Sequence, residues 1–158
     1  MPVVFGLIRL ALGFVFLWSF LDKLWGLGFA TEAGKAVVDG VSPTSGFLKF
    51  GVQGPFAELF GALAGNGLVD WLYMLGMLGV GLALIFGVMT RFTSWIGVLL
   101  MLLIYLAVLP PEHNPVVDEH VIYILILLAL PAMKADQSLG LGRWWKSQGF
   151  VQRSKFFQ

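Results

Sequence analysis

Asp118, Glu119 and His120 are three adjacent ionisable residues at the start of an otherwise apolar stretch. On a helix, where successive residues are about 100° apart, Glu119 and His120 fall in one sector with Tyr123. Asp118 points elsewhere and is expected to pair with another helix. Because histidine titrates near neutral pH, an imidazole beside a carboxylate suits proton exchange with a bound carbonyl or hydroxyl group. A quinone headgroup is one ligand that requires this chemistry, with His120 exchanging protons and Glu119 or Asp118 assisting.

The same three residues also have a purely structural interpretation, in which acidic side chains favour the positive end of a helix and interfacial water solvates them. The uncharged run that follows, residues 121–133, argues for a deeper position, since at ~1.5 Å per residue it covers only ~20 Å of a ~30 Å hydrocarbon core. Asn114 as N-cap and Pro115 as first helical residue predict a helix that begins at 115 and completes the crossing. Alternatively, Lys134 snorkels and the helix slides toward water.

Further candidates for ligand binding come mainly from the other predicted helices. They are Lys23, Asp22, Trp18, Trp25, Tyr123, Asp70 and Arg9. Lys23 is expected to hold an anionic form of the ligand, and the aromatic residues to line its pocket. Arg9 either snorkels to the inner headgroups or faces inward, and the sequence leaves both alternatives open.

The two histidines do not predict a haem or metal site. His113 and His120 lie on one stretch of chain, whereas a haem in a helix bundle normally takes axial ligands from facing helices. Imidazole and carboxylate suit zinc, copper or iron, but no recognised ligand spacing is present. The sequence has no cysteine, which excludes disulfides, thiolate metal sites and thioether-linked haem.

Composition indicates the class of protein that must position these residues. Of the 158 residues, 58% are hydrophobic and 12% charged, and the mean hydropathy is +0.86, whereas soluble domains contain about 25% charged residues. The net charge of +1 gives no basic footprint for nucleic acid. The sequence therefore predicts an integral protein of the cell membrane that crosses it several times and contacts membrane lipid.

The predicted fold is an all-α membrane protein, a four-helix transmembrane bundle with a long outer loop. The loop is expected to contain short amphipathic or re-entrant helices that act as a lid, because Phe56, Leu59, Phe60 and Leu63 share one helical face. The first helix lacks the charge pattern of a signal peptide and is expected to be retained. The expected segments are helices at about 3–25, 69–89, 92–110 and 115–135, the outer loop 26–68, a membrane domain 1–146 and a cytoplasmic tail 147–158.

Charge asymmetry predicts the orientation of this bundle. With the amino terminus inside, the outer side carries three lysines against eight acids, and the inner side carries seven basic residues against Asp136. The inner basic residues are Arg9, Arg91, Lys134, Arg143, Lys146, Arg153 and Lys155. Because cytoplasmic segments carry an excess of Lys and Arg, both termini are predicted to be cytoplasmic.

The order of several segments resembles the DoxX/DoxD family of membrane proteins. They are "RLALGFVFLWSFLDKLWG", "LGVGLALIFGVMTRFTSWIGVLLM", "NPVVDEHVIYILILLAL" and "GLGRWW". The loop segments "SPTSGFLKFGVQGPFAELFG" and "VDWLYMLG" are similar to the DoxD branch in particular, the membrane subunit of thiosulfate:quinone oxidoreductase. The resemblance covers about residues 7–146. It implies a four-helix bundle that works with quinone and with a second subunit, DoxA, in oxidising thiosulfate to tetrathionate.

The leading functional hypothesis is therefore a membrane subunit of a quinone-linked respiratory oxidoreductase, with the quinone site near the outer membrane face. One alternative is a non-catalytic scaffold that docks a redox partner or a terminal oxidase. Another is a transporter of a small solute, although the sequence shows no inverted repeat. Self-association into a homo-oligomer is left open.

Overall fold

The computed structural model describes residues 3–154, and within that range the chain is helical and contains no strand. Three helices are long and apolar enough to cross a membrane: α1 (Val3–Trp25), α4 (Gly67–Phe86) and α5 (Thr90–Ala107). A fourth apolar helix, α6 (Glu119–Ala132), is shorter. The prediction of an all-helical protein with helices of membrane-spanning length is therefore confirmed.

The start of α6 differs from the sequence prediction. Asn114 behaves as a cap, because its Oδ1 accepts the amides of Val116 and Val117 at 2.9 Å, but no helix follows it. Two consecutive β-branched valines favour extended backbone over helix. The true N-cap is Asp118, whose side chain accepts the His120 and Val121 amides. The prediction of a helix over 115–135 was wrong at both ends.

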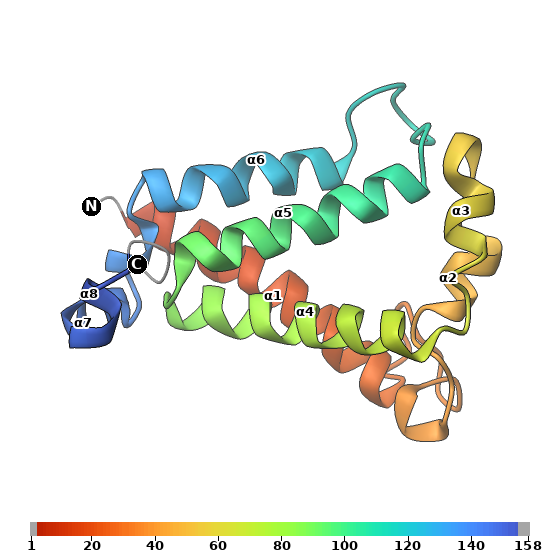
Figure 1. Ribbon diagram of the computed structural model, residues 1–158, viewed down its shortest axis with the longest axis horizontal. Coiled ribbons are helices and arrows are strands. Elements are labelled where there is room, and N and C mark those ends of the chain that lie inside the picture. The colour runs from red at the N-terminus through yellow and green to blue at the C-terminus, as the bar shows by residue number, and fades with distance from the viewer. Residues whose placement is uncertain (1–2, 155–158) are drawn as a thin grey trace.

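The four long helices pack as two antiparallel pairs, α1 with α4 and α5 with α6, which are joined through α4 and α5. Glycines allow the closest approach: a Cβ added to Gly81 would lie 2.7 Å from the backbone nitrogen of Leu17, and one on Gly13 would lie 3.0 Å from that of Ile85. The core between the helices is apolar and includes Phe16. As Figure 1 shows, the pairs lie together at one end and diverge toward the other.

The segment between α1 and α4 forms a lid over the diverging end, which we call the lid end (Figure 1). It contains short helices: η1 (Val37–Asp39), α2 (Ser45–Phe50), η2 (Gly54–Phe56) and α3 (Ala57–Gly61). Several hydrogen bonds attach it to α4 and α5. The hydroxyl groups of Ser42 and Thr44 donate to the Asp70 carboxylate on α4 at 2.9 and 2.5 Å. The backbone amide of Gln53 donates to the Ala107 carbonyl of α5 at 3.0 Å.

The opposite end, which we call the tail end, carries the start of α1 and the last helices of the chain (Figure 1). These are η3 (Ala135–Gln137), α7 (Gly142–Ser147) and α8 (Gly149–Gln152). The segment predicted as a tail, 147–158, is thus partly helical, and its residues 155–158 lie outside the described range.

Candidate functional site

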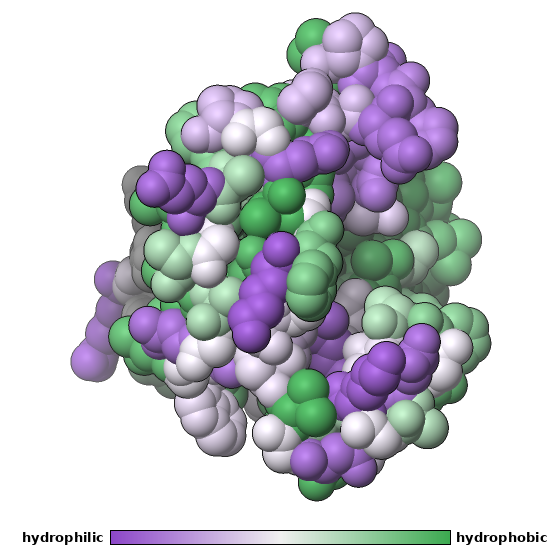
Figure 2. Space-filling model, turned by 90° about the vertical axis from the view of Figure 1, so that its right-hand side faces the viewer, coloured by the Kyte–Doolittle hydropathy of each residue, from purple (hydrophilic) through white to green (hydrophobic). Residues whose placement is uncertain are grey.

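A cavity of about 640 Å³ lies between the two helix pairs and beneath the lid. Its wall is mostly apolar and is formed by α1, α4, α5 and α6 together with the lid, including the lid helices α2 and α3. The polar side chains in the wall are Ser19, Lys23, Thr44, Tyr73, His120 and Tyr123. Ligand pockets typically measure about 300–1,000 Å³ and combine an apolar wall with a few placed polar groups. Figure 2, which looks onto the lid end, shows apolar atoms recessed between polar ones.

His120 enters this wall with a fixed orientation, because its ring Nδ1 lies 2.8 Å from Oδ2 of Asp118. The other oxygen of Asp118 accepts the amides of His120 and Val121, at 3.0 and 3.2 Å. Burial alone raises the pKa of Asp118, but hydrogen bonds from the His120 ring and the Val121 amide outweigh it and hold this pKa below its ordinary value.

An ionised carboxylate only accepts hydrogen bonds, so Nδ1 of His120 carries a proton and donates it to Asp118. In the neutral imidazole, Nε2 is then the proton acceptor. The prediction that Asp118 pairs with another helix was wrong, because Asp118 is the N-cap of α6 and partners His120 two residues later. Glu119 is exposed and does not line the cavity.

Lys23 lies where the large cavity meets a second one of about 160 Å³. Ser19, Lys23 and Tyr73 line both cavities, and the Lys23 ammonium lies 6.0 Å from the centroid of the Tyr73 ring. Trp18 and Phe29 line the small cavity and are in edge contact, with ring centroids 5.1 Å apart. Within residues 3–154, no ion pair joins Lys23 to Asp118 or Glu119.

Asp22 and Asp70 have structural partners. The buried carboxylate of Asp22 accepts the backbone amides of Phe29 and Thr31, at 3.3 and 2.8 Å, and thereby fixes the chain that leaves α1. Asp70 accepts the two lid hydroxyl groups described above. Neither carboxylate lines the large cavity, and Trp25 is exposed and lines neither cavity. Of the predicted ligand-binding residues, only Lys23 and Tyr123 therefore line the large cavity.

Arg9 faces inward at the tail end and is fully buried, so the snorkelling alternative was wrong. Its guanidinium donates to the carbonyls of Leu84 and Ile85 at the end of α4, and it also binds three carbonyls in the segment after α6. Those carbonyls belong to Ala135, Ser138 and Leu139. A cation suits the carbonyl end of a helix, where four acceptors lack partners. Arg9 therefore clamps two segments together and does not belong to the cavity.

An ion pair with one buried partner joins α7 to the segment that Arg9 binds. The Lys146 ammonium of α7 lies 2.6 Å from Oδ2 of Asp136, which is itself buried. The contact with Lys146 is the ion pair of the Asp136 carboxylate within residues 3–154.

The ligand atoms of Asp118, Glu119 and His120 all lie within 4.8 Å of one another, which is close enough for one metal ion. However, both oxygens of Asp118 already accept hydrogen bonds, one from the His120 ring and one from backbone amides. Helix capping and the contact between the two side chains therefore account for Asp118 and His120, and Glu119 is exposed.

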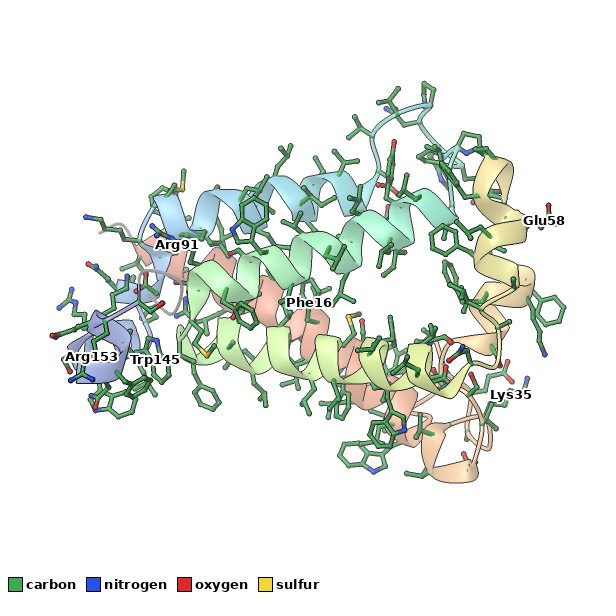
Figure 3. All side chains as sticks on the ribbon, viewed as in Figure 1. Phe16, Lys35, Glu58, Arg91, Trp145 and Arg153 are labelled. Atoms are coloured by element: carbon green, nitrogen blue, oxygen red, sulfur yellow. The ribbon has the colours of Figure 1, made fainter. Side chains whose placement is uncertain are left out.

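The lid end of the bundle carries both acidic and basic residues, whereas the tail end carries mainly basic residues. Figure 3 shows Lys35 and Glu58 at the lid end, Arg91 and Arg153 at the tail end, and Phe16 between them in the bundle. Lys35 is paired with Glu32 at 2.8 Å on the exposed surface of the lid. This Glu32 contact raises the pKa of Lys35, and the reciprocal contact lowers the pKa of Glu32.

Sequence reasoning missed Tyr73, Ser19 and Thr44 as lining residues. The sequence spacing could have pointed to Tyr73, because it follows Asp70, a predicted site residue, by three residues and therefore lies on the same side of α4. No protein-family model, curated protein or solved structure matches the chain. The resemblance to the DoxX/DoxD family therefore stays a prediction.

Proposed function

We propose that the chain crosses the membrane four times, with the tail end in the cytoplasm and the lid end outside. The described part of the tail end carries six basic residues against Asp136, and the positive-inside rule assigns such an end to the cytoplasm. The fourth crossing is α6, which lies along α5 (Figure 1). At ~1.5 Å per residue its 14 residues cover ~21 Å, and Lys134 can snorkel to complete the crossing.

This topology has a direct test, because the chain contains no native cysteine. Lys35→Cys and Arg153→Cys place single thiols at opposite ends. A membrane-impermeant maleimide added to intact cells should label Lys35→Cys and label Arg153→Cys only after the cells are broken. Labelling of both variants in intact cells would contradict the proposed orientation.

We further propose that the large cavity binds a quinone and that the chain is the membrane subunit of a quinone-linked oxidoreductase. The observation that carries this proposal is the placement of the oriented His120 imidazole in an apolar cavity that also contains Lys23 and two tyrosines. A quinone, when bound, accepts two electrons and two protons and thereby becomes the hydroquinone.

The residues of the chain supply the proton and charge steps of this reaction. His120, held by Asp118, donates a proton from Nε2 toward a ligand oxygen when it is protonated and accepts one there when it is neutral. Lys23 stabilises negative charge on the oxygen that receives electrons. The electrons come from a redox partner protein, and a thiosulfate-oxidising subunit is the partner that the family resemblance suggests.

The test is binding of a benzoquinone with one isoprenoid unit to the purified protein in mild detergent, measured by titration calorimetry. Loss of one hydrogen bond, worth about 0.5–1.5 kcal/mol, should weaken binding about 2- to 12-fold in His120→Ala. His113→Ala is the matched control, because His113 is the only other histidine and lies in an exposed loop outside the cavity. Equal affinities for His120→Ala and wild type would refute the proposal, as would the absence of quinone binding.

A further inference from the structure

The wall of the large cavity is open between α4 and α5. Three leucines of α4 and α5 line the cavity and also have large exposed fractions: Leu72 (62%), Leu99 (52%) and Leu103 (43%). Leu72 belongs to α4, and the other two belong to α5. A side chain that contacts a cavity and the surroundings at once marks an opening in the wall.

The helices themselves define where the opening ends. A Cβ added to Gly76 of α4 would lie 2.9 Å from Leu100 of α5, so the two helices are in close contact at this level. Nearer the tail end, Gly97 of α5 lies against Val80 and Leu127, which are both buried. The seam between α4 and α5 is therefore closed from the level of Gly76 and Leu100 toward the tail end and open toward the lid end. Leu72 and Leu103 lie beside the opening, and Leu99 lies at its edge.

The cavity is also too large for a single ring. A protein cavity of about 150 Å³ takes up one benzene molecule, and this cavity has about four times that volume. A headgroup placed at His120 therefore leaves apolar space for part of a chain attached to it.

The polarity of the wall gives such a ligand one orientation. Lys23, Tyr73, His120 and Tyr123 all belong to the helix turns nearest the lid end. The parts of the wall nearer the middle of the bundle are apolar and include Phe16, which is fully buried. A ligand with a polar head and a long apolar chain matches this gradient.

We propose that the open half of the α4–α5 seam is a lateral portal, through which the isoprenoid chain of the quinone passes from the cavity into the bilayer. This inference rests on the proposed function. It assigns Leu72, Leu99 and Leu103 to the recognition of the ligand chain, separately from the headgroup at His120. It also provides a route by which the ligand enters from the membrane without opening the lid.

The experiment compares two probes with the same benzoquinone headgroup, one with a single isoprenoid unit and one with a long isoprenoid chain. Binding is measured to the full chain in phospholipid nanodiscs. Leu72→Trp places a bulky ring in the seam. It should weaken binding of the long-chain probe about fivefold or more and leave binding of the short-chain probe within about twofold of wild type. Leu75→Trp is the matched control, because Leu75 lies on the same helix with 57% exposure and does not line the cavity.

The outcomes separate the portal from the function on which it rests. If neither probe binds the wild type, the proposed function fails and the portal fails with it. If both probes bind but Leu72→Trp affects them equally, or Leu75→Trp has the same effect, the portal is refuted while quinone binding stands.

A second measurement covers the case in which Leu72→Trp does not fold. The chain has no native cysteine, so Leu103→Cys introduces a single thiol. An apolar maleimide should alkylate this thiol more slowly when the long-chain probe is bound than when the short-chain probe is bound. Equal alkylation rates would refute the portal. Rapid oxidation of Leu103→Cys to a disulfide-linked dimer would refute it as well, because the seam would then be an interface between two copies.

Discussion

Asp118 has two structural roles that substitutions can separate. Its Oδ1 caps α6, and its Oδ2 accepts the hydrogen bond from the His120 ring. In Asp118→Asn the side-chain oxygen can still cap the helix, but the amide nitrogen replaces Oδ2 and cannot accept the Nδ1 proton. In Asp118→Ala both roles are lost. The two variants should therefore differ in stability and share a defect in ligand binding.

The expected magnitudes follow from these contacts. Loss of an N-cap costs about 0.5–2 kcal/mol, and in a chain of this length 1 kcal/mol moves Tm by roughly 2–4 °C. Asp118→Ala should lower Tm by roughly 1–8 °C, and Asp118→Asn should remain within about 2 °C of wild type. Both should weaken binding of the short-chain quinone about 2- to 12-fold, because the imidazole loses the acceptor that keeps a proton on Nδ1 and leaves Nε2 free to accept one.

Circular-dichroism melting in one detergent and calorimetric titration measure the two effects independently. The account of helix capping is refuted if Asp118→Asn loses as much stability as Asp118→Ala. The account of the His120 contact is refuted if Asp118→Asn binds the quinone as tightly as wild type.

The pH dependence of stability provides a further check on the same residue. The folded-state pKa of Asp118 lies below its ordinary value of 3.8. The stability that its ionised form contributes is therefore fully present above that value and is lost as the pH falls below it. Below about pH 4, Tm of the wild type should fall more steeply than Tm of Asp118→Asn. Parallel profiles of the two proteins would contradict this assignment.

Three other predictions concern the scaffold. Arg9→Leu leaves buried carbonyls without donors and should destabilise the protein by about 3–5 kcal/mol in urea unfolding; a loss below 1 kcal/mol would contradict the clamp. Gly81→Ala should cost about 1–3 kcal/mol, because its methyl group meets the backbone of α1. Gly79→Ala, which faces open space, should be neutral or stabilising; equal effects of the two would contradict the packing. Gln53→Ala removes side-chain hydrogen bonds to the Val108 and Pro110 carbonyls just after α5 and should speed amide exchange in α2 and α3; unchanged exchange would show that the Gln53 side chain does not hold the lid.

The helices were predictable from sequence because long apolar runs between charges are a strong signal. The first run predicted a helix over 3–25, and α1 spans Val3–Trp25. The start of α6 was not predictable from the same signals. Asn114 and Asp118 are both good caps, and only the conformation of the two valines between them decides which one begins the helix.

The site was predictable in its residue types and less so in its contacts. His120, Tyr123 and Lys23 do share one cavity, because each lies near the lid end of its helix. Helical angles could not place Asp118, since the first residue before a helix does not follow the helical period. The inward position of Arg9 depends on carbonyls that are distant in sequence and become available only when α4 and α6 end beside it.

Photolabelling with a short-chain azidoquinone tests most directly the central claim that the large cavity holds a quinone headgroup. The account predicts saturable labelling of the peptide that contains His120 and Tyr123, suppressed by excess unlabelled quinone and reduced in His120→Ala but not in His113→Ala. Labelling that does not saturate, or that falls only on residues outside the cavity wall, would contradict the account.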